Sequence, residues 1–228
     1  MFYNPLDRLE GRIADIQPST IFADLDFVQV RRTSGKDDPA YTYDFIDKYG
    51  SILYSGVEQN TFFGRLCGPS NRSIKLDVRN SQDIVAFTVN RHPILPCFKM
   101  LNYCDSLRDE IEVRCDYEAA YVGRVIKDCN YCKIRYSIYN QKNSAEFRLI
   151  SDFQNCFSFN NFKRYDECKF DIVDIRAKEI VGSIIKGPEG PIEGGEADLA
   201  SFYIRFPDYL KWNLKMMIVS AGILIMYI

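Results

Sequence analysis

The chain has 228 residues, of which 46% are hydrophobic and 26% charged, so it holds enough apolar surface for one large or two small folded domains and is not a disordered protein. The formal net charge of −2 and the lack of any dense basic run exclude electrostatic binding of nucleic acid, and no nucleic-acid partner is expected. Aromatic residues reach 14%, a composition that favours β-strands.

The first 40 residues predict an N-terminal lead-in segment with the first helix and strand elements. Leu6, Leu9, Ile13 and Ile16 recur at helical spacing. The N-terminus has no continuous apolar stretch, so no secretory signal is expected. In the reducing compartment that follows from this, the eight cysteines are expected to be free thiols.

From residue 41 onward the pattern predicts one β-rich domain. Short segments of alternating apolar and polar residues come in pairs, and each pair is joined by turn residues, which is the pattern of hairpins. The predicted hairpins span 41–54, 74–89, 134–149 and 170–185, and a single strand at 201–206 follows. Because turns recur through the whole middle of the chain, we expect an antiparallel sheet that closes or folds upon itself.

The last predicted element is a helix at 214–228, which carries no charge from Met216 onward. A helix that is apolar on all sides must be buried, either in a protein core or in lipid. At 1.5 Å per residue it spans about 22 Å, whereas the apolar core of a bilayer is about 30 Å thick. The length favours burial within the β-structure. Membrane insertion is the alternative, because Lys211, Trp212 and Lys215 would suit an anchor at the membrane interface.

Six motifs follow one another along the chain: Tyr43-x-Phe45-x-Asp47-x-x-Gly50, Arg65-Leu66-Cys67-Gly68-Pro69, Arg91 with Pro93, Val122-Gly123-Arg124-Val125, Val181-Gly182-Ser183-Ile184 and Phe206-Pro207-x-x-Leu210. In this order and spacing they resemble the phospholipid scramblase family, over nearly the whole chain. The resemblance implies a mainly β fold, a closed antiparallel barrel of about twelve strands around the apolar C-terminal helix, as in tubby-like domains. The barrel domain would cover 41–228 and include helix 214–228.

The resemblance also implies a function. Phospholipid scramblases move phospholipids between bilayer leaflets in both directions without ATP, stimulated by calcium and without covalent chemistry, so no enzyme activity is expected. Membrane phospholipids would be the partners, together with oligomers or other proteins, and the chain would associate with the cytoplasmic face of the plasma membrane. The alternative is a tubby-like module that binds lipids or proteins and transports nothing. An inserted terminal helix would favour the first function and a buried helix the second.

The calcium site that the resemblance implies is an EF-hand-like loop running here from Asp198 to Tyr209. Calcium takes about six to eight oxygen ligands. Asp198 fills the first loop position, but Ala200 and Tyr209 stand where the family has aspartates. Asp208 and Glu196 are the nearest carboxylates that could compensate. We therefore expect weak calcium binding with Asp198 as ligand, and the alternative is that these are solvated loop carboxylates.

Cysteine and histidine chemistry gives little else. The family carries adjacent cysteines that are palmitoylated, and here Cys97 and Cys104 are the isolated candidates, with inert thiols as the alternative. The pair Cys129 and Cys132 lacks the second pair that zinc needs. His92 is the only histidine and shows no sign of a catalytic partner. No catalytic or cofactor-binding residue is expected.

Overall fold

The computed structural model describes residues 18–34, 40–59, 73–91, 109–115, 120–128, 133–152, 168–187, 190–191, 197–207 and 209–226. Two helices and thirteen strands lie in these ranges. In chain order they are α2 (Pro18–Ala23), β1 (Phe27–Ser34), β2 (Tyr41–Ile46), β3 (Ile52–Glu58), β4 (Ile74–Asn80), β5 (Val85–Arg91), β6 (Glu110–Cys115), β7 (Ala120–Asp128), β8 (Lys133–Asn140), β9 (Ala145–Asp152), β10 (Cys168–Asp174), β11 (Ile180–Gly187), β12 (Gly190–Pro191), β13 (Ala197–Arg205) and α5 (Trp212–Ile225).

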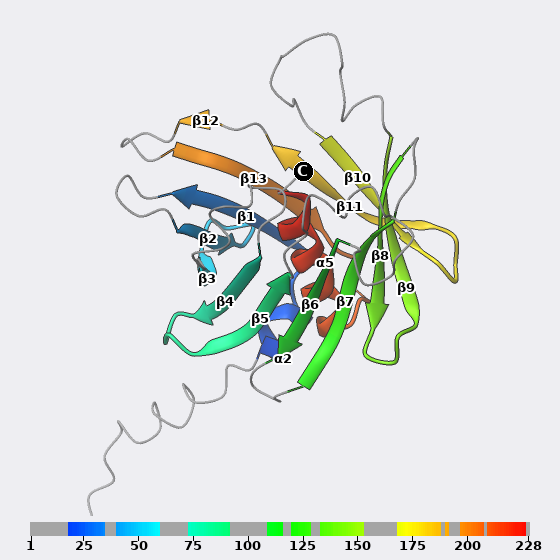
Figure 1. Ribbon diagram of the computed structural model, residues 1–228, viewed down its shortest axis with the longest axis horizontal. Coiled ribbons are helices and arrows are strands. Elements are labelled where there is room, and N and C mark those ends of the chain that lie inside the picture. Colours follow the sequence, from blue (N-terminus) through cyan, green and yellow to red (C-terminus); the bar gives the residue numbers. More distant parts are fainter. Residues whose placement is uncertain are drawn as a thin grey trace, which may run out of the picture.

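The strands form a closed antiparallel barrel (Figure 1). From β1 to β11 each strand pairs with the next one along the chain, and β11 pairs with β13. β13 then pairs with β1, starting from Phe27 opposite Arg205, which closes the ring. Strands β1 to β11 and β13 make up the ring, while the two-residue β12 pairs only with β13. The predicted mainly β, closed barrel of about twelve strands is therefore confirmed, and β1 from the N-terminal segment is one of its strands.

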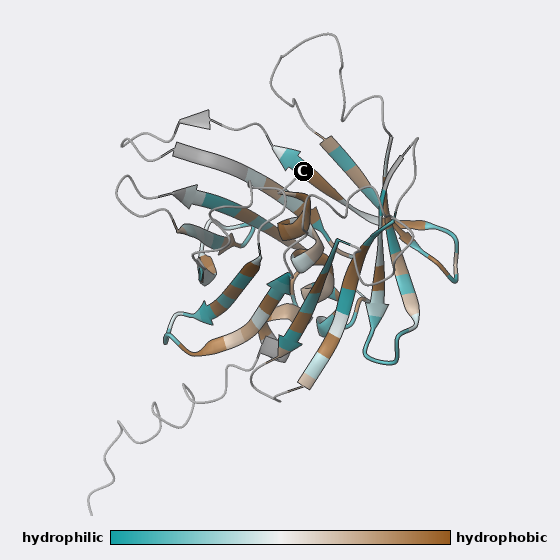
Figure 2. Ribbon diagram, viewed as in Figure 1, coloured by the Kyte–Doolittle hydropathy of each residue, from teal (hydrophilic) through white to brown (hydrophobic). Residues whose placement is uncertain are grey.

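Alternating burial explains why these segments are strands. In β4, Ile74, Leu76 and Val78 are buried, and Lys75 between them is exposed. Successive side chains of a strand point to opposite faces, so one face of the ring fills the interior and the other meets solvent. The same alternation appears as teal and brown bands along several strands in Figure 2.

Four of the hairpin turns are built in the same way. The side-chain oxygens of Asp47, Asn80, Asn140 and Asp174 each accept hydrogen bonds from backbone N–H groups two to four residues further along, at 2.7–3.0 Å. Asx side chains that bond their own turn in this way favour a tight reversal. The turn chemistry thus fixes the ends of the hairpins β2–β3, β4–β5, β8–β9 and β10–β11.

Helix α5 runs through the interior of the barrel (Figure 1). It packs against β6, β7, β8, β13 and α2, and its residues from Lys215 to Ile225 are buried. Burial, the alternative favoured by length, is what the structure has. The alternative, in which Lys215 would anchor the helix at a membrane interface, does not hold for this residue, which lies inside the protein with 1% of its surface exposed. Within the described ranges, neither helix has both the length and the hydropathy that a membrane crossing requires.

The two ends of the barrel differ. Because strand direction alternates, the connections 47–51, 81–84, 141–144 and 175–179 share one end with α2 and with segment 206–211, and we call this the turn end. Helix α5 begins at the turn end. It finishes at the opposite end, where the Arg32 guanidinium of β1 donates a hydrogen bond to the Met226 carbonyl (3.5 Å). A cation at a helix C-terminus also complements the helix dipole.

Candidate functional site

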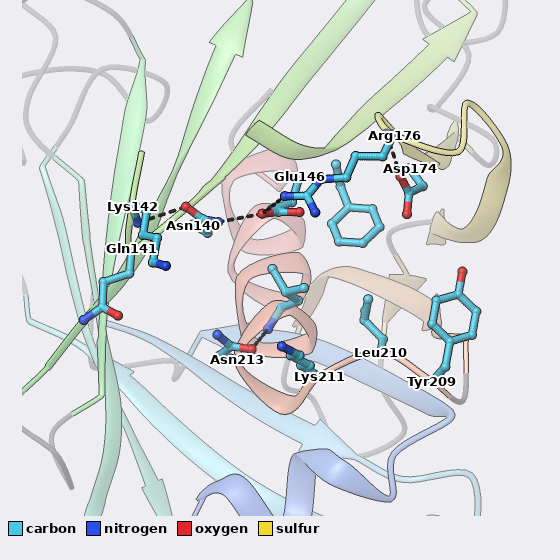
Figure 3. A pocket seen from close by; sticks show the side chains of 12 residues that line it. Asn140, Gln141, Lys142, Glu146, Asp174, Arg176, Tyr209, Leu210, Lys211 and Asn213 are labelled. Carbon is cyan, nitrogen blue, oxygen red and sulfur yellow. Dashed lines mark hydrogen bonds and ion pairs between the residues drawn. The ribbon is translucent and has the colours of Figure 1, made fainter. Parts of the chain in front are cut away.

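A pocket of about 550 Å³ lies at the turn end, beside the start of α5 (Figure 3). Its walls come from the β8–β9 turn, the β10–β11 turn and the segment that leads from β13 into α5. Phe147, Leu210 and Leu214 supply apolar lining. A cavity of this size, with apolar and polar walls, is in the range of small-ligand sites.

Glu146 organises the polar side of the pocket. Its Oε1 atom accepts hydrogen bonds from Asn140 Nδ2 (2.6 Å) and from Arg176 Nη2 (3.1 Å), so Glu146 lies between the two in Figure 3. The backbone joins the same two hairpins, because Ile175 N–H donates to the Glu146 carbonyl (3.1 Å). These bonds hold the β8–β9 and β10–β11 turns in one position relative to each other.

The lining carries charges of both signs. Lys142, Arg176 and Lys211 are cationic, and Glu146 and Asp174 are anionic. Within the part of the chain that the structure describes, the ammonium groups of Lys142 and Lys211 make no ion pair, so they can meet a ligand. Cations beside a carboxylate suit a ligand that has both a phosphate and an ammonium group.

A second polar cluster lies at the opposite end of the barrel. Arg91, at the end of β5, bonds through Nε to Asp109 Oδ1 at 2.8 Å, and the arginine side chain is only 1% exposed. The Tyr136 side chain is fully buried, and burial raises the pKa of its hydroxyl well above the usual value, with the nearby Asp109 charge acting in the same direction. A buried ion pair of this kind fixes structure, so the first residue of the predicted Arg91 and Pro93 motif is structural.

The predicted calcium ligand lies in a strand. The backbone of Asp198 belongs to β13, where it pairs with Thr33 on one side and with Gly190 on the other. Glu196 and Asp208 lie outside the described residues. Over those residues, no group of three or more Cys, His, Asp or Glu could hold a metal ion.

The lipidation candidates Cys97 and Cys104 also lie outside the described residues, as do His92 and the pair at 129 and 132. Cys115 is buried and forms no disulfide, as expected. The expectation of free thiols is wrong for Cys168, which is disulfide-bonded. Disulfide formation requires that the fold bring two thiols within bonding geometry, which the spacing of cysteines along the sequence does not reveal.

Comparison with known proteins identifies the family. The model of the family described as Scramblase matches residues 39–228, most of the chain. The chain belongs to the Scramblase family. Membership supports a scramblase-type lipid function, with phospholipids as substrates and a membrane as the place of action. The family translocates lipids and is not a catalytic one. Neither a curated protein nor a solved structure matches the chain.

Two of the motifs that carried the resemblance to the Scramblase family have a packing explanation. Gly123 in β7 and Gly182 in β11 each follow a register shift in the strand pairing. A Cβ at Gly123 would collide with the Tyr139 carbonyl oxygen, and one at Gly182 with the Arg205 carbonyl oxygen. Glycine inside a strand marks a bulge or a close backbone approach, and both apply here.

Sequence reasoning missed the pocket of this Scramblase-family chain. Its residues come from three segments far apart in the sequence, and each segment by itself reads as an ordinary turn. The one available signal was a lysine at each of three hairpin or loop positions, Lys142, Lys178 and Lys211. Only barrel closure places the three segments at one end.

Proposed function

We propose that this chain moves phospholipids between the two leaflets of a bilayer, in both directions and without ATP. The observation that carries the proposal is the Scramblase family match over residues 39–228. The pocket supports it, because its cations and carboxylates complement the phosphate and the ammonium of a zwitterionic headgroup. No covalent bond is made or broken in this process.

The physical barrier to the process is the passage of a charged headgroup through hydrocarbon. Unsatisfied polar groups there cost several kcal/mol each. Helix α5 is buried in the barrel from Lys215 to Ile225, so only its first turn can meet a lipid. The proposed path therefore follows the polar exterior at the turn end, where Lys142 and Lys211 meet the phosphate and Asp174 meets the ammonium.

Reconstitution tests the proposal. The purified chain is placed in vesicles that contain a fluorescent phospholipid in both leaflets, and dithionite is added outside. We expect bleaching to go beyond the outer leaflet with the protein and to stop there without it. Lys142→Ala with Lys211→Ala should slow the inner-leaflet phase, whereas Lys75→Ala, an exposed lysine on the wall of β4, should leave it unchanged. Bleaching restricted to the outer leaflet in all samples would refute transport.

Calcium stimulation stays a prediction that rests on Asp198. Its other candidate carboxylates, Glu196 and Asp208, lie outside the described residues, so no step of the movement is assigned to the ion. The assay above, repeated with calcium and with chelator, measures any stimulation. Asp198→Ala should abolish it, and the exposed Glu179→Ala should not.

Attachment to the cytoplasmic face of the plasma membrane through Cys97 and Cys104 also stays a prediction. Stable anchoring takes two membrane signals, so two acylated thiols would suffice. Acyl-exchange labelling of the wild type and of a variant with both cysteines replaced by Ser measures the acylation directly. Equal labelling of the two proteins would contradict it.

A second candidate function is a tubby-like module that binds phospholipids or proteins without transport. The burial of α5 favours it, because a helix that forms the core does not perturb a bilayer. The vesicle assay separates the two functions. Binding to vesicles with bleaching limited to the outer leaflet would identify the binding module.

A further inference from the structure

The turn end carries nearly all the large hydrophobic side chains that the described residues expose. There are six such side chains, and five belong to the turn end, namely Tyr49, Ile52, Ile84, Ile180 and Tyr209. Tyr49 is 81% exposed, Tyr209 70% and Ile180 65%. The sixth, Val57, lies near the opposite end of β3. Single exposed apolar residues are ordinary, but their gathering at one end of a barrel marks that end as an interaction surface.

The arrangement of these five side chains favours a bilayer over a protein. They come from four different connections around the ring, so they form separate tips rather than one contiguous patch. A protein interface has a continuous, close-packed core. Separate tips with tyrosine and isoleucine can each enter the interfacial region of a bilayer, where an aromatic ring with a polar atom is favoured.

The free charges at the turn end fit an anionic surface. Lys142, Lys178 and Lys211 are exposed and have no ion-pair partner in the described ranges. Three other cations of this end take part in ion pairs, Lys48 with Asp26, Arg79 with Asp83 and Arg176 with Glu146.

The turn end also carries carboxylates. Asp47 and Asp174 are engaged by backbone N–H groups of their own turns. Asp24 and Glu179 remain exposed. The surface is therefore of mixed charge, and the apolar tips carry the larger share of any membrane affinity.

We infer that the turn end of the barrel docks on a phospholipid membrane, with the apolar tips in the interfacial region and the three lysines against anionic headgroups. The inference rests on the proposed function for its partner, a bilayer, and adds which face meets it. The pocket lies at this same end, so docking places it against the headgroups. Helix α5 stays in the barrel throughout, since no contact of the docked face involves its buried residues.

Vesicle flotation tests the apolar tips. The full chain is mixed with vesicles of phosphatidylcholine alone or with added phosphatidylserine. Partial insertion of a large apolar side chain corresponds to about a tenfold change in affinity. Tyr49→Ser, Ile180→Ser and Tyr209→Ser combined should therefore weaken binding by about three orders of magnitude. The control is Val57→Ser, which removes an apolar side chain of similar exposure (53%) at the other end and should bind as the wild type does.

The lysines are tested by charge reversal. Each lysine near an anionic surface contributes about fivefold to the affinity, so Lys142→Glu, Lys178→Glu and Lys211→Glu should together reduce binding to the phosphatidylserine vesicles far more than to phosphatidylcholine alone. Added salt should reduce wild-type binding in the same selective way. Lys75→Glu, on the barrel wall, is the matched control.

Trp212, the only tryptophan of the chain, reports which face docks. It is half-buried at the start of α5, at the turn end. Lipids that carry a spin label near the headgroup should quench its fluorescence when the wild type is bound. Wild type that floats without quenching, a combined serine variant that binds normally, or no binding to either vesicle would each overturn the inference. The dithionite assay is independent of vesicle binding. Scrambling that persists in the serine variant would contradict the docking face and leave the proposed function standing. Docking of the wild type without scrambling would support the docking face and contradict the proposed function.

Discussion

Lys215 is the only charged residue of helix α5, and it is buried. Its Nζ atom donates hydrogen bonds to the carbonyls of Ala23 (2.8 Å) and Leu25 (2.6 Å), which belong to the connection between α2 and β1. It also stands 5.9 Å from the centre of the Phe206 ring. One side chain thus ties the start of the central helix to the segment that enters the barrel wall. We predict that Lys215→Met, which keeps the length of the side chain and removes its charge, destabilises the fold.

The magnitude follows from these contacts. A hydrogen bond from a charged donor contributes about 1.5–3 kcal/mol, so the two together contribute about 3–6 kcal/mol. Methionine avoids the desolvation of a buried ammonium, which offsets about half of that loss. The net decrease in the free energy of unfolding is then about 3 kcal/mol. For a chain of this size each kcal/mol lowers Tm by about 2–4 °C, so we expect a decrease of about 6–12 °C.

Thermal unfolding followed by circular dichroism measures the change. The matched control is Lys211→Met, one turn earlier, where the side chain is exposed and makes no ion pair among the described residues. That variant should stay within about 0.5 kcal/mol of the wild type. If the Lys215→Met and Lys211→Met proteins melt together, the two carbonyl hydrogen bonds do not hold the helix, and the reasoning is refuted.

Two further predictions concern ion pairs. Asp109→Asn removes the carboxylate from the buried Arg91 guanidinium and should lower the free energy of unfolding, measured in urea, by about 3 kcal/mol. The control is Glu112→Gln, at the more exposed pair with Arg114, which should change this free energy by less than about 1 kcal/mol. Equal effects of the two substitutions would contradict the structural role of the Arg91–Asp109 pair. At the turn end, the hydrogen bond from Lys48 holds the pKa of Asp26 below its usual 3.8. The stabilisation from this lowered pKa is present above pH 3.8 and is lost as the pH falls through the pKa of Asp26 in the folded state. Lys48→Met should therefore raise the pKa of Asp26, measured by NMR titration. An unchanged pKa would show that another group lowers it.

The hairpins could be predicted from the sequence because their determinants are local. Alternation in β4 and the turn after Asn80 lie within a few residues of each other, and the same is true around Asn140. Strand β6 was missed although Glu110–Cys115 alternates in the same way, and that signal was available. A first strand was expected within residues 1–40, but its place in the barrel wall was not, because its pairing with β13 joins the two ends of the chain.

The remaining features depend on contacts between distant segments. Barrel closure requires Phe27 to meet Arg205, and the pocket requires Lys142, Arg176 and Lys211 to come together. Helix α5 is a similar case, because its apolar composition indicates burial but does not show whether the surroundings are a protein core or lipid. Lys215 was read as an interface anchor because a lysine beside an apolar helix is common at membrane surfaces. Its actual partners are backbone carbonyls some 190 residues away in sequence, which no local pattern can indicate.

The position of α5 also decides where a lipid path can run. To enter a bilayer, the helix would have to leave its two carbonyl bonds through Lys215, the bond between Arg32 and Met226, and the close fit of Gly222 against the Phe202 ring. After leaving, its 14 residues would span about 21 Å, less than the roughly 30 Å of a bilayer core. The exchange loses packing and gains no complete crossing. The path proposed above for a headgroup therefore follows the outside of an intact barrel at the turn end, where the lysines, the apolar tips and the pocket lie together.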